Sequence, residues 1–327
     1  MQTINGNLFY EMLLSGAAAM EEDRDRINDL NVFPVPDGDT GSNMTATVLA
    51  VRQIDADSSI AAVSAQAARQ MMRSARGNSG VILSLFFRGM ARSFAGTDEA
   101  DAAGILHAFR EGAKQAASAV DRPVEGTILT VMRDCIPDEC GDSTESGDSA
   151  ECGDIPALFT AILHRAEEIL AQTPEMLPAL KRAKVVDSGG AGFVSILAGM
   201  TAVLTGTASS VHRAPVRTAP DTAIPAEDEE IRFGFCTECL LDLPEAIPDD
   251  RLAAIRQALQ SMGDSMVLTA DEDLFKVHIH TNEPMRVLEM LLPLGTLRAS
   301  KIENMRLQHD GVVKKAAGSQ KSPAPAP

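Results

Sequence analysis

The segment that decides the fold reads Asn31-Val-Phe-Pro-Val-Pro-Asp37-Gly-Asp39-Thr-Gly41-Ser42-Asn43-Met44. Its two carboxylates, Asp37 and Asp39, lie two residues apart on a proline-stiffened loop, and a Thr-Gly-Ser-Asn turn then leads into an apolar helix. Hard oxygen ligands beside a helix N-terminus suit a divalent cation that carries phosphate. The segment therefore predicts a metal-dependent phosphate site. Asp37 and Asp39 could instead cap the helix, because Asp and Asn are favoured at that position.

Two further glycine-rich turns precede apolar helices. One is Arg76-Gly77-Asn78-Ser79-Gly80, and the other is Asp187-Ser188-Gly189-Gly190-Ala191-Gly192. Each places glycine at the positive end of a helix dipole, where backbone N–H groups can approach an anion closely. Together with the first segment they predict helix N-termini that converge on one polyanion. No Gly-Lys-Ser/Thr follows, so this is not a Walker loop. Alone, the turn at 76–80 could be a plain helix–helix connection, and Thr127 after Pro123-Val-Glu-Gly could be a cap or a phosphate contact.

Composition narrows the class of protein. The chain has 327 residues with no Trp, one Tyr and 11 Phe, so alanine, leucine and methionine must fill closely spaced helices. The net charge of −17 argues against nucleic acid or an anionic membrane as the main partner. We find no apolar run of the roughly 20 residues that cross a membrane and no signal peptide. Five cysteines do not suggest a secreted disulfide framework. We expect a cytoplasmic protein without a transmembrane segment.

Helical periodicity dominates residues 1–206 and predicts an all-α bundle or barrel. The expected helices lie near 8–20, 44–54, 60–72, 80–94, 102–117, 125–132, 155–170 and 190–204. An acidic, Ser/Gly-rich stretch over 135–154 interrupts them, and we interpret it as a mobile surface loop. Its cysteines, Cys135, Cys140 and Cys152, could bind metal, but their spacing fits no standard zinc site.

The sequence predicts a second, smaller α+β domain over 230–308. A linker over 207–229 precedes it, and a disordered tail over 309–327 follows it. The expected order is strand, helix, strand, strand, helix, strand, which is that of a ferredoxin-like split βαβ sandwich. The elements are expected over 231–241, 249–262, 265–269, 274–280, 284–292 and 297–302.

A candidate zinc site lies in this second domain. His278 and His280 stand at i and i+2 of one expected strand, so both imidazoles point to the same face. Cys236 from another strand would complete a Cys-His-His set with an open fourth position. The alternative is an ordinary polar sheet face. Cys239, three residues after Cys236, should face the other way, although a Cys-x-x-Cys pair is a rival interpretation.

The motifs at 31–44, 76–83, 123–131 and 187–193 together resemble the nucleotide-binding domain of the dihydroxyacetone kinase L-subunit family. The match is closest to bacterial fatty-acid kinase catalytic subunits, and it covers residues 1 to about 310. The resemblance implies a helical barrel that binds ATP and a pair of Mg²⁺ ions, followed by a middle domain that carries the same Cys and His-x-His set for Zn²⁺. It also implies a fatty-acid-binding partner protein and a homodimer formed through the middle domain.

The resemblance assigns roles to individual residues. Asp37 and Asp39 would hold Mg²⁺, and Asn31 falls near a further ligand position where relatives have Asp. We expect Asp37, Asp39, His278 and His280 to act in catalysis. The nucleotide would contact Thr40, Gly41, Ser42, Asn43, Gly77, Asn78, Ser79, Gly80, Thr127, Asp187 and Gly189. No protein nucleophile is needed if a substrate carboxylate attacks the γ-phosphate to give an acyl phosphate.

Three functions remain open on the sequence. The first is an ATP-dependent kinase acting on a fatty acid that a separate protein presents. The second is a small-ketone kinase of the dihydroxyacetone type, although such chains usually end with the helical domain. The third is a non-enzymatic nucleotide-binding scaffold that dimerises through residues 230–305. Fatty-acid kinase catalytic chains normally continue into a C-terminal domain, which we expect to be missing after the tail.

Overall fold

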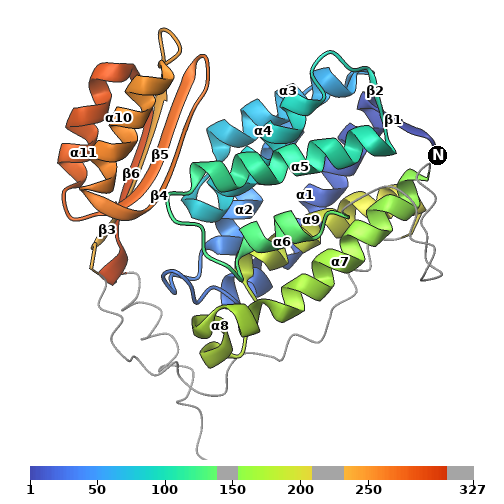
Figure 1. Cartoon of the computed structure of the whole chain (residues 1–327), viewed down its shortest axis with the longest axis horizontal. Helices are drawn as coiled ribbons and strands as arrows, with labels where there is room; N and C mark the ends of the chain where they lie inside the picture. Colours follow the sequence, from blue (N-terminus) through green and yellow to red (C-terminus); the bar gives the residue numbers. More distant parts are fainter. Residues whose placement is uncertain (138–153, 208–231, 308–327) are drawn as a thin grey trace, which may run out of the picture. The chain divides into compact units, whose positions relative to one another are not determined.

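The structure is a computed structural model that describes residues 1–137, 154–207 and 232–307 (Figure 1). The chain divides into two compact units. The first comprises Met1–Leu30 and Asp39–Val216, and the second comprises Asn31–Gly38 and Arg217–Pro327. Most of the predicted loop over 135–154, the predicted linker and nearly all of the predicted tail lie outside the described residues, as do Cys140 and Cys152.

The first unit is mostly helical, which confirms the predicted class. Its helices are α1 (Gly6–Asp29), α2 (Thr40–Val48), the 3-10 helix η1 (Leu49–Gln53), α3 (Ile60–Ser74), α4 (Gly77–Ser93), α5 (Ala102–Ala119), α6 (Ile128–Asp134), α7 (Ile155–Met176), α8 (Pro178–Ala183) and α9 (Ser188–Thr205).

Three features of this unit differ from the sequence prediction. A two-stranded antiparallel sheet joins β1 (Thr3–Asn5) to β2 (Glu99–Asp101), and strands this short show no readable alternation. Helix α8 has six residues, too few for a period. Helix α1 runs well beyond residue 20 through a polar stretch, because the buried Asp23 there pairs with Arg26 and accepts from Ser195 Oγ at 2.5 Å.

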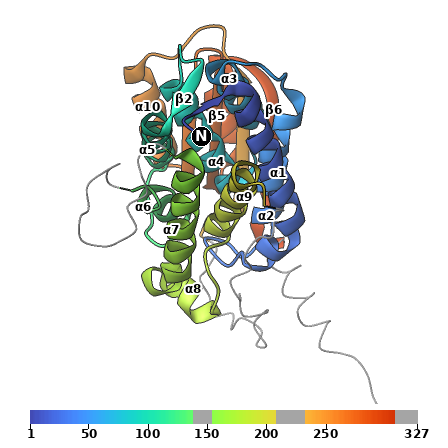
Figure 2. The same ribbon diagram turned by 90° about the vertical axis from the view of Figure 1, so that its right-hand side faces the viewer.

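The core of the helical unit forms between helices that are distant in sequence. Helix α1 packs along α9, and α4 packs along α5 (Figure 2). Phe86 of α4 meets Phe109 of α5 and Phe193 of α9 edge to face, with ring centroids 5.5 and 5.1 Å apart. Such T-shaped aromatic pairs add to the free energy gained by burial alone. These contacts fix α4 and α9 against each other close to their N-terminal turns.

Helix α9 is also the most apolar helix of the unit. By length and composition Ser188–Thr205 could cross a membrane, but 72% of it is buried inside the protein. Its first turn is rich in glycine and serine, and its later residues pack against α1 and α7. An apolar helix with this burial is typical of the centre of a packed helical domain.

The second unit is an α+β sandwich, as predicted. Its elements are β3 (Phe235–Asp242), α10 (Asp249–Gln260), β4 (Gly263–Ala270), β5 (Leu274–Thr281), α11 (Pro284–Leu291), the short 3-10 helix η2 (Leu292–Leu294) and β6 (Thr296–Asn304). The strands lie in the antiparallel order β4-β5-β3-β6. Both α-helices lie on one face of the sheet (Figure 1), where their apolar residues and those of the strands form a core that includes Leu241, Leu259 and Phe275.

Candidate functional site

The first turn of α2 is built from the predicted phosphate segment. The helix begins at Thr40, and Asp39 takes the N-cap position without any side-chain cap hydrogen bond. Capping is therefore not what the Asp39 carboxylate does. Asn28 of α1 instead accepts from Ser42 N at 3.0 Å and donates to Ser42 Oγ at 3.1 Å. Gly41 is required by packing, because a Cβ atom there would collide with the Arg24 carbonyl oxygen.

Asn31 and Asp37 lie in the segment Asn31–Gly38, which groups with the second unit. Within that segment the Asn31 side-chain amide donates to Asp37 Oδ1. The Asp37 backbone N–H donates to Val35 O at 2.9 Å, which tightens the loop before Asp39. Asn31 is thus a partner of the acidic loop, and its predicted role as a metal ligand stays a prediction.

The first turns of four helices of the helical unit meet at one place. Space for side chains at their glycines shows this. A Cβ atom on Gly77 of α4 would collide with the Asn43 side chain of α2. A Cβ on Gly192 of α9 would lie 2.6 Å from the sulfur of Met44, and one on Gly189 would lie 3.1 Å from Ile128 Cβ of α6. Glycine thus allows the N-terminal ends of α2, α4, α6 and α9 to approach one another closely.

Two of these turns leave backbone donors without a side-chain cap. Neither Arg76 at α4 nor Thr127 at α6 makes a cap hydrogen bond, and the Thr127 hydroxyl donates to Val124 O at 2.8 Å. Among the described residues, Asn78 Oδ1 is buried without a hydrogen-bond partner. Uncapped N–H groups at a helix end form an anion site, and a buried unpaired polar atom calls for a ligand or water. Ser79 lies beside Asn78 in the same turn, half-buried.

Asp187 closes this arrangement at α9. Its side chain accepts from Gly190 N at 2.7 Å and so caps the helix, and its backbone N–H donates to Thr173 Oγ1 at 3.1 Å. Burial raises the pKa of Asp187 to about 6, although hydrogen bonds from the Gly190 and Ile128 backbones oppose the shift. A carboxylate in this setting gains from a nearby cation, because a positive charge compensates for lost hydration.

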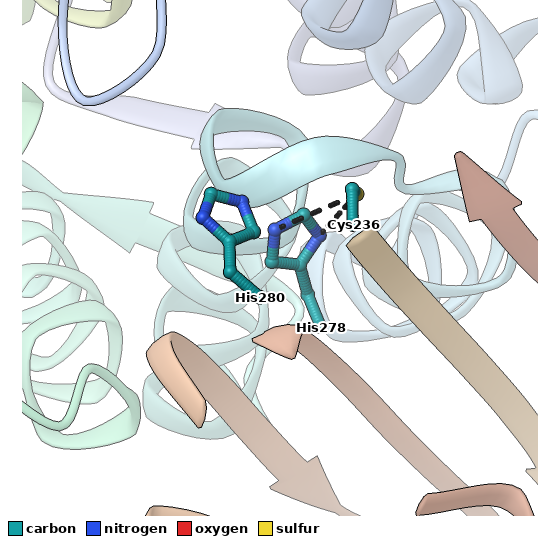
Figure 3. Close-up of side chains that lie close together, drawn as sticks. All are labelled: Cys236, His278 and His280. Atoms are coloured by element: carbon teal, nitrogen blue, oxygen red, sulfur yellow. Dashed lines mark hydrogen bonds between the residues drawn. The ribbon is translucent and has the colours of Figure 1, made fainter. Parts of the chain in front are cut away.

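The second cluster lies on the α+β sheet. Cys236 comes from β3, and His278 and His280 come from the neighbouring β5 (Figure 3). All three are buried, and one ligand atom from each lies within 4.8 Å of the others. The Cys236 sulfur stands 3.9 Å from His278 Nδ1 and 4.0 Å from Nε2. Two imidazoles and one thiol at this spacing suit Zn²⁺ with a fourth position left for substrate or water.

The two histidines of the cluster have opposite electrostatic surroundings. Burial disfavours the charged ring of His278, but the neighbouring Cys236 sulfur and Glu238 carboxylate outweigh it and raise the His278 pKa to about 10. Burial, reinforced by the positive charge of His278, lowers the pKa of His280 to about 3. Titratable groups whose environments separate their pKa values are typical of functional sites.

Glu238 is the residue of this cluster that the sequence reasoning missed. Its Oε1 atom stands 3.1 Å from His278 Nδ1, and both side chains are buried. The signal was present, because Glu238 follows Cys236 at i+2 and so shares its face of the strand.

The other cysteines are inert by position. Cys239 faces the opposite side of the sheet and belongs to the apolar core, as its i+3 spacing from Cys236 predicted. Burial raises its pKa to about 11. Cys135 is likewise buried, and burial raises its pKa to about 12. Neither thiol is poised to act as a nucleophile.

Two protein-family models match the chain. Residues 34–202 match the DAK2 domain. The chain belongs to the DAK2 domain family. Residues 232–312 match the FakA-like middle domain, which is described from fatty acid kinases. The DAK2 match contains the four helix N-termini described above, and the second match contains the Cys236 cluster. The chain thus combines two domains that occur in kinase families.

Full-length relatives extend the comparison. Protein YloV of Bacillus subtilis is 39% identical over 100% of this DAK2 chain and 61% of its own length. Protein SSP1546 of Staphylococcus saprophyticus is 36% identical over 95% of this chain and 57% of its own. The chain therefore spans about three fifths of the length of these curated relatives.

A solved structure is also similar. The dihydroxyacetone kinase from C. freundii, crystallised in complex with AMP-PNP and Mg²⁺, is 17% identical to the DAK2 chain with a TM-score of 0.45. The likeness covers 62% of this chain and 34% of that one, and it is too distant to speak about ligands here.

Proposed function

We propose that this protein transfers the γ-phosphoryl group of ATP to a carboxylate, most specifically that of a fatty acid held by a separate binding protein. The observation that carries the proposal is the meeting of the α2, α4, α6 and α9 N-termini beside Asp39, whose carboxylate is not used as a cap. Phosphoryl transfer is catalysed mainly by positioning and by electrostatic stabilisation, and helix N-termini provide both.

The nucleotide would lie across these helix ends. Phosphate oxygens accept hydrogen bonds from the first-turn N–H groups of α4 and α6, and from the Ser42 hydroxyl, whose oxygen Asn28 already holds. Asp37, Asp39 and Asn31 supply oxygen ligands for Mg²⁺, which would neutralise charge on the phosphates when bound. A protein with a net charge of −17 needs such local screening to accept a polyanion.

The chemistry needs no nucleophile from the protein. A carboxylate oxygen of the substrate forms a bond to the γ-phosphorus while the bond from that phosphorus to the β-bridging oxygen breaks. ADP leaves with the electron pair, and the product is an acyl phosphate. The helix ends hold the phosphate oxygens, and Asp187 and Asn78 border the nucleotide from α9 and α4. The fatty-acid acceptor is supported by the match of residues 232–312 to the FakA-like middle domain of fatty acid kinases.

The Cys236 cluster is proposed as a zinc site that serves the acceptor. Its donor set fits the ion, since all three residues are buried and offer nitrogen and sulfur ligands within 4.8 Å of one another. Bound Zn²⁺ would act as a Lewis acid toward a carboxylate or phosphate oxygen. Cys236 would bind as thiolate, and His278 and His280 as neutral rings. We also propose that the protein is cytoplasmic, works with a fatty-acid-binding partner and dimerises through the α+β unit.

Removal of the Asp39 charge tests the nucleotide site. Asp39→Asn keeps the shape of the side chain, so the helix end stays intact while the metal loses a charged ligand. We expect Mg²⁺-dependent affinity for ATP to fall roughly tenfold or more, measured by calorimetric titration with and without Mg²⁺. Asp55→Asn, at an exposed position of the same unit, is the control. Unchanged affinity in Asp39→Asn would contradict the site.

A substrate panel tests the acceptor. The protein is incubated with Mg–ATP and a fatty acid loaded on its binding protein, and acyl phosphate is trapped with hydroxylamine. Dihydroxyacetone is the competing acceptor, because the DAK2 match alone is equally compatible with a ketone kinase. Transfer to dihydroxyacetone instead of the fatty acid would replace the proposal. Nucleotide binding without transfer to either acceptor would favour a binding scaffold.

A further inference from the structure

Glu238 occupies the centre of a row of charged side chains that crosses the sheet. In the strand register Glu238 of β3 lies directly opposite His278 of β5 on one side and Lys301 of β6 on the other. Residues directly opposite in antiparallel strands share a face and lie about 5 Å apart at Cβ. The row therefore shares the face of Cys236 and His280, opposite the face covered by α10 and α11.

Contact with Glu238 decides which nitrogen of His278 is left for a metal. The 3.1 Å contact joins Glu238 Oε1 to Nδ1, so the Nδ1–H donates to the carboxylate. Nε2 then remains as the donor to an ion and lies 4.0 Å from the Cys236 sulfur. In a tetrahedral zinc site these two ligand atoms would be about 3.5 Å apart, so only a small closure is required.

A structural role for Glu238 alone explains less of this geometry. A buried carboxylate needs compensating charge, and Lys301 on the neighbouring strand could provide it. Lys301, however, forms an ion pair with Glu303, at 2.7 Å. The short contact of Glu238 is with His278, and both of these side chains are less than a tenth exposed.

Its counterpart at His280 is weaker. Asp264 Oδ1 lies 3.8 Å from His280 Nδ1, beyond hydrogen-bonding distance, and the Asp264 side chain is 52% exposed. Each histidine of the pair thus has a carboxylate nearby, but only Glu238 is close enough to orient its ring.

We propose that Glu238 is a positioning residue that holds His278 by Nδ1–H and so presents Nε2 to a zinc ion shared with Cys236 and His280. The inference rests on the proposed zinc site and adds its outer partner. A carboxylate that accepts from a ligating histidine fixes the ring and raises its basicity, and its loss commonly weakens metal binding 10- to 100-fold.

Zinc affinity of single variants tests the proposal in the full chain. Glu238→Ala removes the acceptor, whereas Glu238→Gln keeps an oxygen at the same place without the charge. Asp264→Ala removes a carboxylate beside the same cluster that is too far away to orient a ring. Affinity is measured by competition with a chromogenic chelator, and the coordination geometry by the visible spectrum of the Co²⁺-substituted protein.

We expect Glu238→Ala to bind zinc roughly 10- to 100-fold more weakly, with an altered Co²⁺ spectrum. Glu238→Gln should retain the wild-type spectrum with a smaller loss, and Asp264→Ala should lose less than Glu238→Ala. Equal losses in Glu238→Ala and Asp264→Ala would overturn the proposal, because charge alone would then explain both. Wild-type affinity in Glu238→Ala would overturn it while leaving the zinc site standing. Absence of zinc binding by the unchanged protein would overturn the site and the role of Glu238 together.

Discussion

At the scale of single residues, Asp187 carries the clearest electrostatic consequence. Burial raises its pKa from 3.8 to about 6, so the folded protein binds this proton more tightly than the unfolded chain does. The folded state is then favoured at low pH, and that contribution is lost as the pH rises from about 4 to about 6. At about 1.4 kcal/mol per pKa unit, the loss amounts to about 3 kcal/mol.

Asp187→Asn should therefore be more stable than the wild type above pH 6 and should lose this advantage toward pH 4. The amide oxygen can still accept from Gly190 N, which keeps the cap. Urea unfolding at several pH values, without nucleotide or metal, measures the difference. Asp101→Asn, at the exposed N-cap of α5, controls for the loss of a carboxylate at a helix end. A difference between wild type and Asp187→Asn that does not change with pH would contradict the prediction.

Residue patterns predicted much of the candidate site but not its connections. The pairing of His278 with His280 and the outward turn of Cys239 follow from strand alternation, which depends only on local backbone geometry. Glu238 and Asn28 were missed, because their partners come from other elements and a single sequence does not display strand register or helix packing. The assignment of Asp37, Asp39 and the helix turns to a nucleotide stays a prediction.

At the scale of elements, close approach of α4 to α2 depends on Gly80. A Cβ atom at this position would lie 2.5 Å from Thr47 Oγ1 and 3.3 Å from the Asn43 carbonyl oxygen. Gly80→Ala should push the α4 turn away from α2 and destabilise the protein by about 1 to 3 kcal/mol, with weaker nucleotide binding. Thermal unfolding and nucleotide titration measure the two effects.

Gly104→Ala is the matched control for this substitution. Gly104 also lies in the first turn of a helix, but a Cβ there meets its nearest atom at 3.3 Å, at the end of the Asp101 side chain. Alanine is the better helix former, so we expect a neutral or stabilising effect of up to about 1 kcal/mol. If Gly80→Ala were equally harmless, close packing of α2 on α4 could not explain the glycine.

The sequence predicted the elements with long periods best. Helices α3, α5, α7 and α9 and all four strands of the second sheet were found, because apolar periodicity reports which face is buried. Errors fell where tertiary contacts override local pattern. Helix α2 begins at Thr40 rather than at 44, since Asn28 supplies partners for Ser42, and α1 continues past residue 20 because Asp23 is paired.

At the scale of the whole molecule, each unit has its own core. The core of the α+β unit is formed by residues of β3 to β5, α10 and α11. A ligand stabilises the structure that binds it according to its concentration relative to Kd. We therefore expect calorimetry to resolve two unfolding transitions, one raised by Mg–ATP and the other by Zn²⁺. Cys236→Ser should abolish the response to zinc and keep the response to Mg–ATP. A single transition that both ligands raise would contradict independent unfolding.

The partnership of α1 with α9 has a consequence for synthesis on the ribosome. Helix α1 ends at Asp29, and the helix that covers it runs from Ser188 to Thr205. Until the ribosome has passed Thr205 and released that stretch from its exit tunnel, the buried face of α1 has no partner, and the nascent chain must keep it from aggregating. Domains with such distant pairings fold slowly. We expect nascent chains that stop short of α9 to be bound by chaperones and cleaved by proteases, and longer ones to resist cleavage.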